Sequence, residues 1–153
     1  MKNTGEKPDL FELLQVEEDR IAKLLKVLTE VDSDLSTENG LKKSKDLFDL
    51  IRKYLNQQDK LVALVEQKTE AGATIQAYKS QRDRIYDLMS QLTLMHVDET
   101  DYFEKLRVLL NKVKEMADLE DARLHKKLRR YLNQSDIEHM RENLLKEFVS
   151  SKY

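Results

Sequence analysis

The stretch Met116-Ala-Asp-Leu-Glu-Asp-Ala-Arg-Leu-His-Lys-Lys-Leu128 carries the pattern from which the fold is inferred. Four of its side chains follow one another at four-residue steps, the spacing of one face of an α-helix: Met116, Glu120, Leu124 and Leu128. Three of them are apolar, and the fourth is a carboxylate. Because a buried charge is costly without a partner or a role, Glu120 marks the middle of this helix as a candidate site.

Apolar side chains recur at helical spacing along most of the chain. They predict four long helices and one short helix, over residues 9–31, 44–69 (or from a few residues earlier), 75–96, about 101–132, and 135–148. Pro8 and Asp9 suit the start of the first helix. Ser135 and Glu138 form a capping box that is expected to open the last one.

The links between these helices indicate how the helices are arranged. Short or turn-rich links at 32–43, 70–74 and 97–100 favour neighbours that run antiparallel. We therefore expect an all-α protein with a single domain, 1–153. Residues 9–132 would form an up-down-up-down antiparallel four-helix bundle, and residues 135–148 a short C-terminal fifth helix that caps it.

The composition supports long helices and excludes several kinds of site. With 153 residues, 3 Gly and 1 Pro, the chain has the size of one domain and few helix breakers. The absence of cysteine excludes disulfides, thiolate metal sites and thiol nucleophiles. A net charge of −2 gives the whole chain no strong attraction to nucleic acid or to an anionic membrane. No signal peptide and no run of ~18 apolar residues is found, so the cytoplasm is the expected location and no membrane partner is expected.

Each long helix carries one polar residue in its apolar face, near the middle of the helix: Glu18, Gln58, Arg82 and Glu120. In an antiparallel bundle the middles of the helices share one layer, so these side chains are expected to converge. The alternative is that they lie at the edges of the apolar faces, where polar groups reach water. Glu18-Asp-Arg-Ile21 also matches Arg82-Asp-Arg-Ile85, which indicates two copies of one helical hairpin.

This pattern resembles the hemerythrin-like family, the HHE cation-binding bundles. The resemblance spans about residues 9–132 and rests on 9–25, on Leu55-Asn-Gln-Gln58 and, most specifically, on 116–128. Members of that family hold a di-iron centre with a histidine in helices 1 and 3 and a His-x-x-x-Glu motif in helices 2 and 4. The resemblance implies that the former ligand positions of this chain are Glu18, Gln58, Val62, Arg82, Met116, Glu120 and Asp121.

All four motif histidines are absent from those positions. Iron sites of this kind need imidazole and carboxylate ligands, whereas Arg82 brings a permanent positive charge that repels metal ions. We therefore expect that the di-iron site is lost and that neither cofactor nor metal is bound. In its place, Arg82 is expected to pair with Glu18 and Glu120 across the core, and breaking such a buried pair would cost about 3–5 kcal/mol.

The sequence favours a non-catalytic bundle, because no motif for nucleophilic, zinc or nucleotide chemistry is found. The expected role is protein interaction, regulation or small-ligand binding, with an unidentified protein partner or small ligand; oligomers stay open. The alternative is a hemerythrin-like protein that still binds iron or another cation through Glu18, Glu120 and Asp121. That protein would keep an oxygen-handling or metal-handling role, with di-iron as the alternative cofactor.

The remaining signals have simple interpretations. The three histidines, His96, His125 and His139, share no motif and are expected to face solvent. His125 and Asp121 are four residues apart and could hold a weak surface metal. The basic run 123–130 suits the negative end of a helix dipole, and a nucleic-acid or adaptor surface there is a less favoured third interpretation. Four tyrosines are expected to pack rather than react: Tyr54, Tyr78, Tyr86 and Tyr131.

Overall fold

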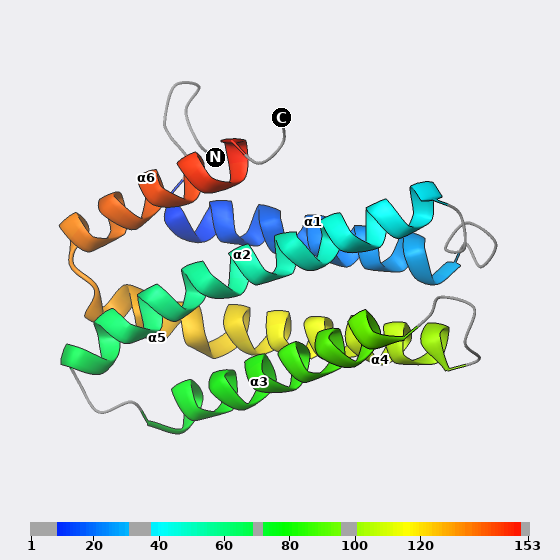
Figure 1. Cartoon of the computed structure of the whole chain (residues 1–153). Coiled ribbons are helices and arrows are strands. Elements are labelled where there is room, and N and C mark those ends of the chain that lie inside the picture. The colour runs from blue at the N-terminus through cyan, green and yellow to red at the C-terminus, as the bar shows by residue number, and fades with distance from the viewer. Residues whose placement is uncertain (1–8, 31–37, 69–71, 96–100, 151–153) are drawn as a thin grey trace.

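The computed structural model describes residues 9–30, 38–68, 72–95 and 101–150 (Figure 1). These ranges contain helices and turns but no β-strand, which confirms the expected all-α class. In chain order the elements are α1 (Leu10–Glu30), α2 (Glu38–Lys68), α3 (Gly72–Leu94), α4 (Tyr102–Leu119), the π-helix η2 (Glu120–Leu124), α5 (His125–Tyr131) and α6 (Gln134–Ser150).

Local signals set the starts of α1 and α3. The Glu12 N–H donates to Asp9 Oδ1 at 2.9 Å, and the Asp9 N–H donates to Glu12 Oε1 at 3.3 Å. This reciprocal capping box satisfies backbone donors that the first turn of α1 leaves without helical partners. Gly72 opens α3 with a φ of 67°, a left-handed conformation that costs glycine little and other residues more.

The start of α6 differs from the prediction. Leu132 is extended and ends α5, and Asn133 Oδ1 then accepts the Asp136 N–H at 2.8 Å. Asn133 is therefore the capping residue of α6. The capping box predicted at Ser135 and Glu138 was wrong, because the helix already begins at Gln134.

The fourth predicted helix is present, but a π-helical turn interrupts it. It was expected to run unbroken to residue 132, and the structure divides it into α4, η2 and α5. The three pieces still follow one another along a single path in Figure 1. The π-helical turn lies within the stretch 116–128, at Glu120 itself.

The helices pack around one apolar core. α1 contacts α2, α4 and α6, and α3 contacts α4 and, less extensively, α2. α6 lies on the outside of α1 and α2 (Figure 1) and buries Met140 and Leu144. Buried apolar side chains from all of these helices form a single cluster. None of the described helices combines the length and the apolar character needed to span a membrane.

Candidate metal centre

A group of polar side chains lies inside this apolar core. α1 contributes Glu18, α2 contributes Tyr54 and Gln58, η2 contributes Glu120, and α5 contributes His125. Each of these residues is at most 6% exposed. We call them the buried polar cluster. Buried polar groups are expensive unless they are hydrogen-bonded, so their contacts indicate what the cluster can do.

Tyr54 links the two carboxylates of the cluster. Its hydroxyl oxygen lies 2.5 Å from Glu18 Oε1 and 3.1 Å from Glu120 Oε2. A phenol has one proton, so it donates to one of these oxygens at a time. Burial, followed by the charges of Glu120 and Glu18, raises the pKa of Tyr54 well above its ordinary value of 10. The hydroxyl therefore stays protonated and neutral.

Gln58 connects Tyr54 to His125. Its amide Nε2 lies 2.9 Å from the Tyr54 hydroxyl oxygen and 2.9 Å from His125 Nε2. With Gln58 as the donor, His125 Nε2 is the acceptor, which assigns the ring proton to Nδ1. In this tautomer the lone pair of Nε2 faces the cluster.

His125 is neutral at pH 7. Burial, assisted by the positive charge of Arg129, lowers the pKa of His125 from 6.5 to about 4. The contact of 3.9 Å between His125 Nε2 and Glu120 Oε2 is therefore not an ion pair. A neutral imidazole is the form that binds metal ions.

Phe11 and Arg129 pack beside the histidine. The Phe11 ring lies 5.3 Å from the His125 ring, centroid to centroid, and the Arg129 guanidinium lies 4.4 Å from the Phe11 centroid. Arg129 also pairs with Asp9 at 3.1 Å. Part of the basic run 123–130 thus has structural contacts within the fold.

The π-helical turn explains how Glu120 and His125 come to share a side. In a regular α-helix a five-residue step leaves two side chains roughly 140° apart. In η2 the His125 N–H donates to Glu120 O, five residues back, and this wider turn takes up one extra residue. The two side chains are thereby brought toward one face. π-helical turns occur often at functional sites, which agrees with this position.

Three side chains of the cluster form a set of possible metal ligands. One ligand atom each from Glu18, Glu120 and His125 lies within 4.8 Å of the others, and all three residues are buried. Beside the two carboxylates and Tyr54 is a cavity of about 10 Å³ with apolar walls that include Ile51 and Met116. That volume is close to the space of one water molecule.

The structure brings together only part of the predicted site. Glu18, Gln58 and Glu120 converge as expected, and Met116 lines the cavity beside them. Val62 is a buried core residue. For Asp121 only the backbone belongs to the described part of the chain.

The predicted position of Arg82 was wrong. Its Nη1 lies 3.0 Å from Asp59 Oδ1 and its Nη2 lies 2.9 Å from Asp83 Oδ1, with its side chain 21% exposed. Asp59 thus supplies, at the edge of the helices, the partner that Glu18 and Glu120 were expected to supply in the core. A guanidinium is costly to remove from water, and at the edge of the helices the Arg82 side chain keeps part of its contact with solvent.

Two functional candidates were missed in the sequence. His125 was expected to face solvent, but it is buried, because the π-helical turn shifts the helical phase after residue 120. Tyr54 was assigned to packing, and its hydroxyl instead joins the two carboxylates. The four-residue spacing of Tyr54 and Gln58, which places both on one face of a helix, was the sequence signal that could have identified Tyr54. His139 is exposed as expected, and His96 lies outside the described residues.

Comparisons with protein-family models, curated proteins and solved structures find no match to the chain. The resemblance to the hemerythrin-like family therefore still rests on the sequence pattern, above all on residues 116–128. The geometry of the buried polar cluster carries the functional argument instead.

Proposed function

We propose that the protein binds one divalent transition-metal ion through Glu18, Glu120 and His125. The observation that carries this proposal is the convergence of three buried ligand atoms, from α1, η2 and α5, within 4.8 Å. Atoms bound at roughly 2.0–2.2 Å from one ion lie at most about 4.4 Å apart, and about 3.4 Å apart in tetrahedral geometry. Side-chain rotations would therefore have to bring the three ligand atoms closer together when the ion binds.

The donor set fits a transition metal. Carboxylate oxygens with a neutral imidazole nitrogen suit zinc, iron and manganese better than calcium, which prefers oxygen ligands alone. A divalent cation would also balance the negative charge of two carboxylates inside an apolar core, where ionised groups are costly. No thiolate is needed, in keeping with a chain that has no cysteine.

One ion fits better than two. A di-iron centre of the family type needs several histidines, and the described cluster supplies one, His125. The adjacent cavity of about 10 Å³ adds little space. Gln58 Oε1 is buried and accepts no hydrogen bond from the described residues. Turning this amide would bring a fourth donor oxygen next to His125.

The remaining cluster residues would position the ligands. The Tyr54 hydroxyl contacts one oxygen of each carboxylate, and such outer hydrogen bonds orient metal ligands and tune their basicity. The apolar cavity is too small for an organic substrate. These features support a metal-binding module rather than an enzyme. The sequence pattern of residues 116–128 is what supports an up-down-up-down bundle of hemerythrin-like descent.

Metal reconstitution tests the proposal. Protein stripped with a chelator is supplied with Mn²⁺, Fe²⁺ or Zn²⁺, and bound metal is measured by plasma mass spectrometry and calorimetry. We expect about one ion per chain for at least one metal, and a higher melting temperature with it. His125→Gln and Glu120→Gln should lose the ion. Glu115→Gln, which changes an exposed carboxylate of α4, should keep it.

Two results would contradict metal binding by the cluster. One is the absence of stoichiometric metal under all three conditions. The other is binding that survives both ligand substitutions, which would place the ion elsewhere on the chain.

A further inference from the structure

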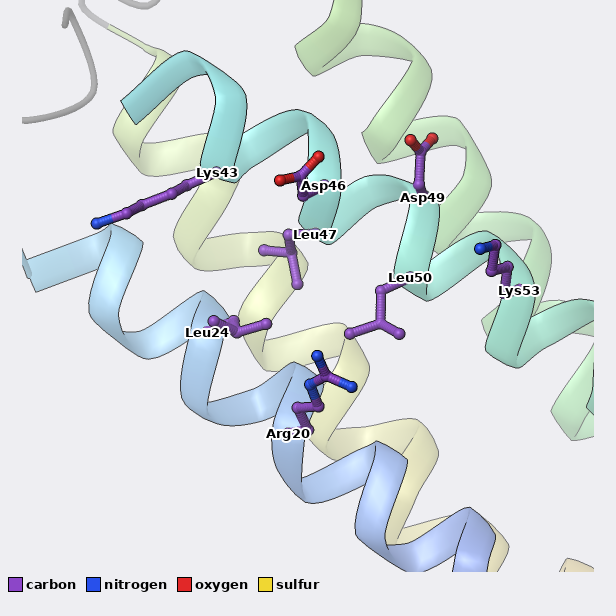
Figure 2. Close-up of a pocket in the computed structure, with 8 residues that line it drawn as sticks. All are labelled: Arg20, Leu24, Lys43, Asp46, Leu47, Asp49, Leu50 and Lys53. Atoms are coloured by element: carbon purple, nitrogen blue, oxygen red, sulfur yellow. The ribbon is translucent and has the colours of Figure 1, made fainter. Parts of the chain in front are cut away.

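A second feature lies on the outside of the molecule, away from the buried polar cluster. The second half of α1 and the first half of α2 enclose a groove of about 380 Å³. Figure 2 shows Arg20 and Leu24 of α1 facing Leu47 and Leu50 of α2 across it. We call this the α1/α2 groove.

The face of α1 beside the groove is apolar although it is exposed. Val16 is 58% exposed, Leu24 39% and Val27 50%. Together with Arg20 they occupy positions i, i+4, i+8 and i+11, which lie along one side of a helix. Single exposed apolar residues are ordinary, whereas a row that adjoins a groove is typical of an interaction surface.

The fold already places a helix on the same pair of helices. α6 packs against both α1 and α2 and buries Met140 and Leu144. Figure 1 shows it beside the first half of α1, and the α1/α2 groove lies along the second half. The outer side of this helix pair therefore has a shape that accepts a helix, and α6 covers only part of it.

The charges around the groove favour an acidic occupant. Figure 2 shows the carboxylates of Asp46 and Asp49 pointing away from α1, and Asp49 is paired with Arg52 at 3.1 Å. Arg20, which also contacts Glu17 at 3.5 Å, lines the groove with Lys43 and Lys53. Other cationic side chains are exposed on the adjacent turns of α1 and α2: Lys23, Lys26 and Lys42. This positive region contrasts with the net charge of −2 of the whole chain.

We propose that the α1/α2 groove binds an acidic amphipathic helix of a partner protein. The apolar side chains of that helix would contact Leu24, Leu47 and Leu50, and its carboxylates would face Arg20 and Lys43. This is the helix-in-groove mode of recognition. A concave site between two helices fits a cylinder better than a flat lipid surface, which favours a helix over a membrane.

A designed peptide tests this proposal directly. The probe has about 16 residues, a leucine face at i, i+3, i+4 and i+7, and glutamates on either side of that face. Its control has the same composition in scrambled order. Binding is measured by fluorescence anisotropy and mapped by backbone amide NMR shifts. We expect saturable binding of the probe alone, with shifts confined to α1, α2 and the part of α6 nearest the groove.

Two matched substitutions separate the groove from the rest of the surface. Leu24→Glu should weaken binding at least about tenfold. Val108→Glu, on α4, changes a side chain of nearly the same exposure (40% against 39%) and should alter binding less than about twofold. Lys43→Glu should weaken binding and reduce its salt dependence, whereas Lys114→Glu, at an exposed site on α4, should not. Circular-dichroism melts establish that all four variants fold.

Several results would overturn the proposal. They are equal binding of probe and scrambled peptide, shifts centred on α3 or α4, or loss of binding in Val108→Glu but not in Leu24→Glu. Two others point to different occupants. Sedimentation with vesicles of equal parts phosphatidylcholine and phosphatidylserine, reversed by Leu24→Glu, would identify a lipid surface. Self-association abolished by the same substitution would identify a second copy of the chain.

Discussion

At the scale of single residues, Tyr54 sets the character of the buried polar cluster. Its phenol lies between Glu18 and Glu120 and also accepts a hydrogen bond from Gln58. Hydrogen bonds to charged groups contribute more than neutral ones, and leaving a buried polar group without its bond costs about 1–3 kcal/mol. The phenol can donate its single proton to only one of the two carboxylates at a time, and the proposed cation would contact both.

Tyr54→Phe should therefore destabilise the metal-free protein by about 1–3 kcal/mol, and by less when metal is bound. Tyr78→Phe is the matched control. It removes a buried phenol whose hydroxyl donates to Asp59 at 2.8 Å, outside the cluster. The loss of unfolding free energy caused by Tyr78→Phe should be the same with and without metal. Urea unfolding with chelator and with saturating metal measures both, and an equal metal dependence of the two variants would contradict the role given to Tyr54.

The depressed pKa of His125 predicts how stability depends on pH. Between about pH 4 and 6.5 the unfolded histidine binds a proton that the folded one does not. Stability contributed by this group is therefore complete above 6.5 and is lost as the pH falls toward 4. The full loss is on the order of 3 kcal/mol. Urea unfolding midpoints, measured in chelator, should be lower at pH 5 than at pH 7. His125→Gln should make this difference smaller. An unchanged difference in that variant would refute the assignment.

At the scale of elements, η2 decides which side chains meet. Predicted with α-helical periodicity, the segment after Glu120 places Leu124 in the core and His125 off its face. In the structure both are buried, because the π-helical turn absorbs one residue. A turn of this kind has no strong sequence signal. The helices and their apolar faces were therefore predictable, while the third candidate ligand, His125, was not.

Changing the residue count within η2 tests this directly. Arg123 is exposed, so deleting it removes no core contact, and it leaves His125 four residues after Glu120. A regular α-helix then keeps both side chains on one face, and metal binding should persist. Inserting one alanine at the same point rotates His125 by about a further 100° and should abolish binding. Calorimetry measures metal binding by both variants. Retention of the metal in the insertion variant would contradict the role given to η2.

At the scale of the whole molecule, the sequence predicted correctly those features that depend on the spacing of residues within one helix. Apolar periodicity predicted an all-α protein, and the polar interruptions predicted that Glu18, Gln58 and Glu120 meet. It failed for Arg82, because the choice between a core partner and Asp59 depends on where α2 and α3 touch. Several carboxylates that are distant in the chain could pair with the Arg82 guanidinium, and a single sequence does not show which of them lies closest to it.

The proposed ion would tie together α1, η2 and α5, and α3 supplies none of its ligands. Metal should therefore slow local opening unevenly. Hydrogen exchange followed by mass spectrometry, with chelator or with metal, should show added protection of at least about tenfold in α1 and α5, which is about 1.4 kcal/mol of local stability. Peptides from α3 should gain clearly less. Equal gains in every helix would mean that the ion acts only on global unfolding, and gains largest in α3 would place it outside the buried polar cluster.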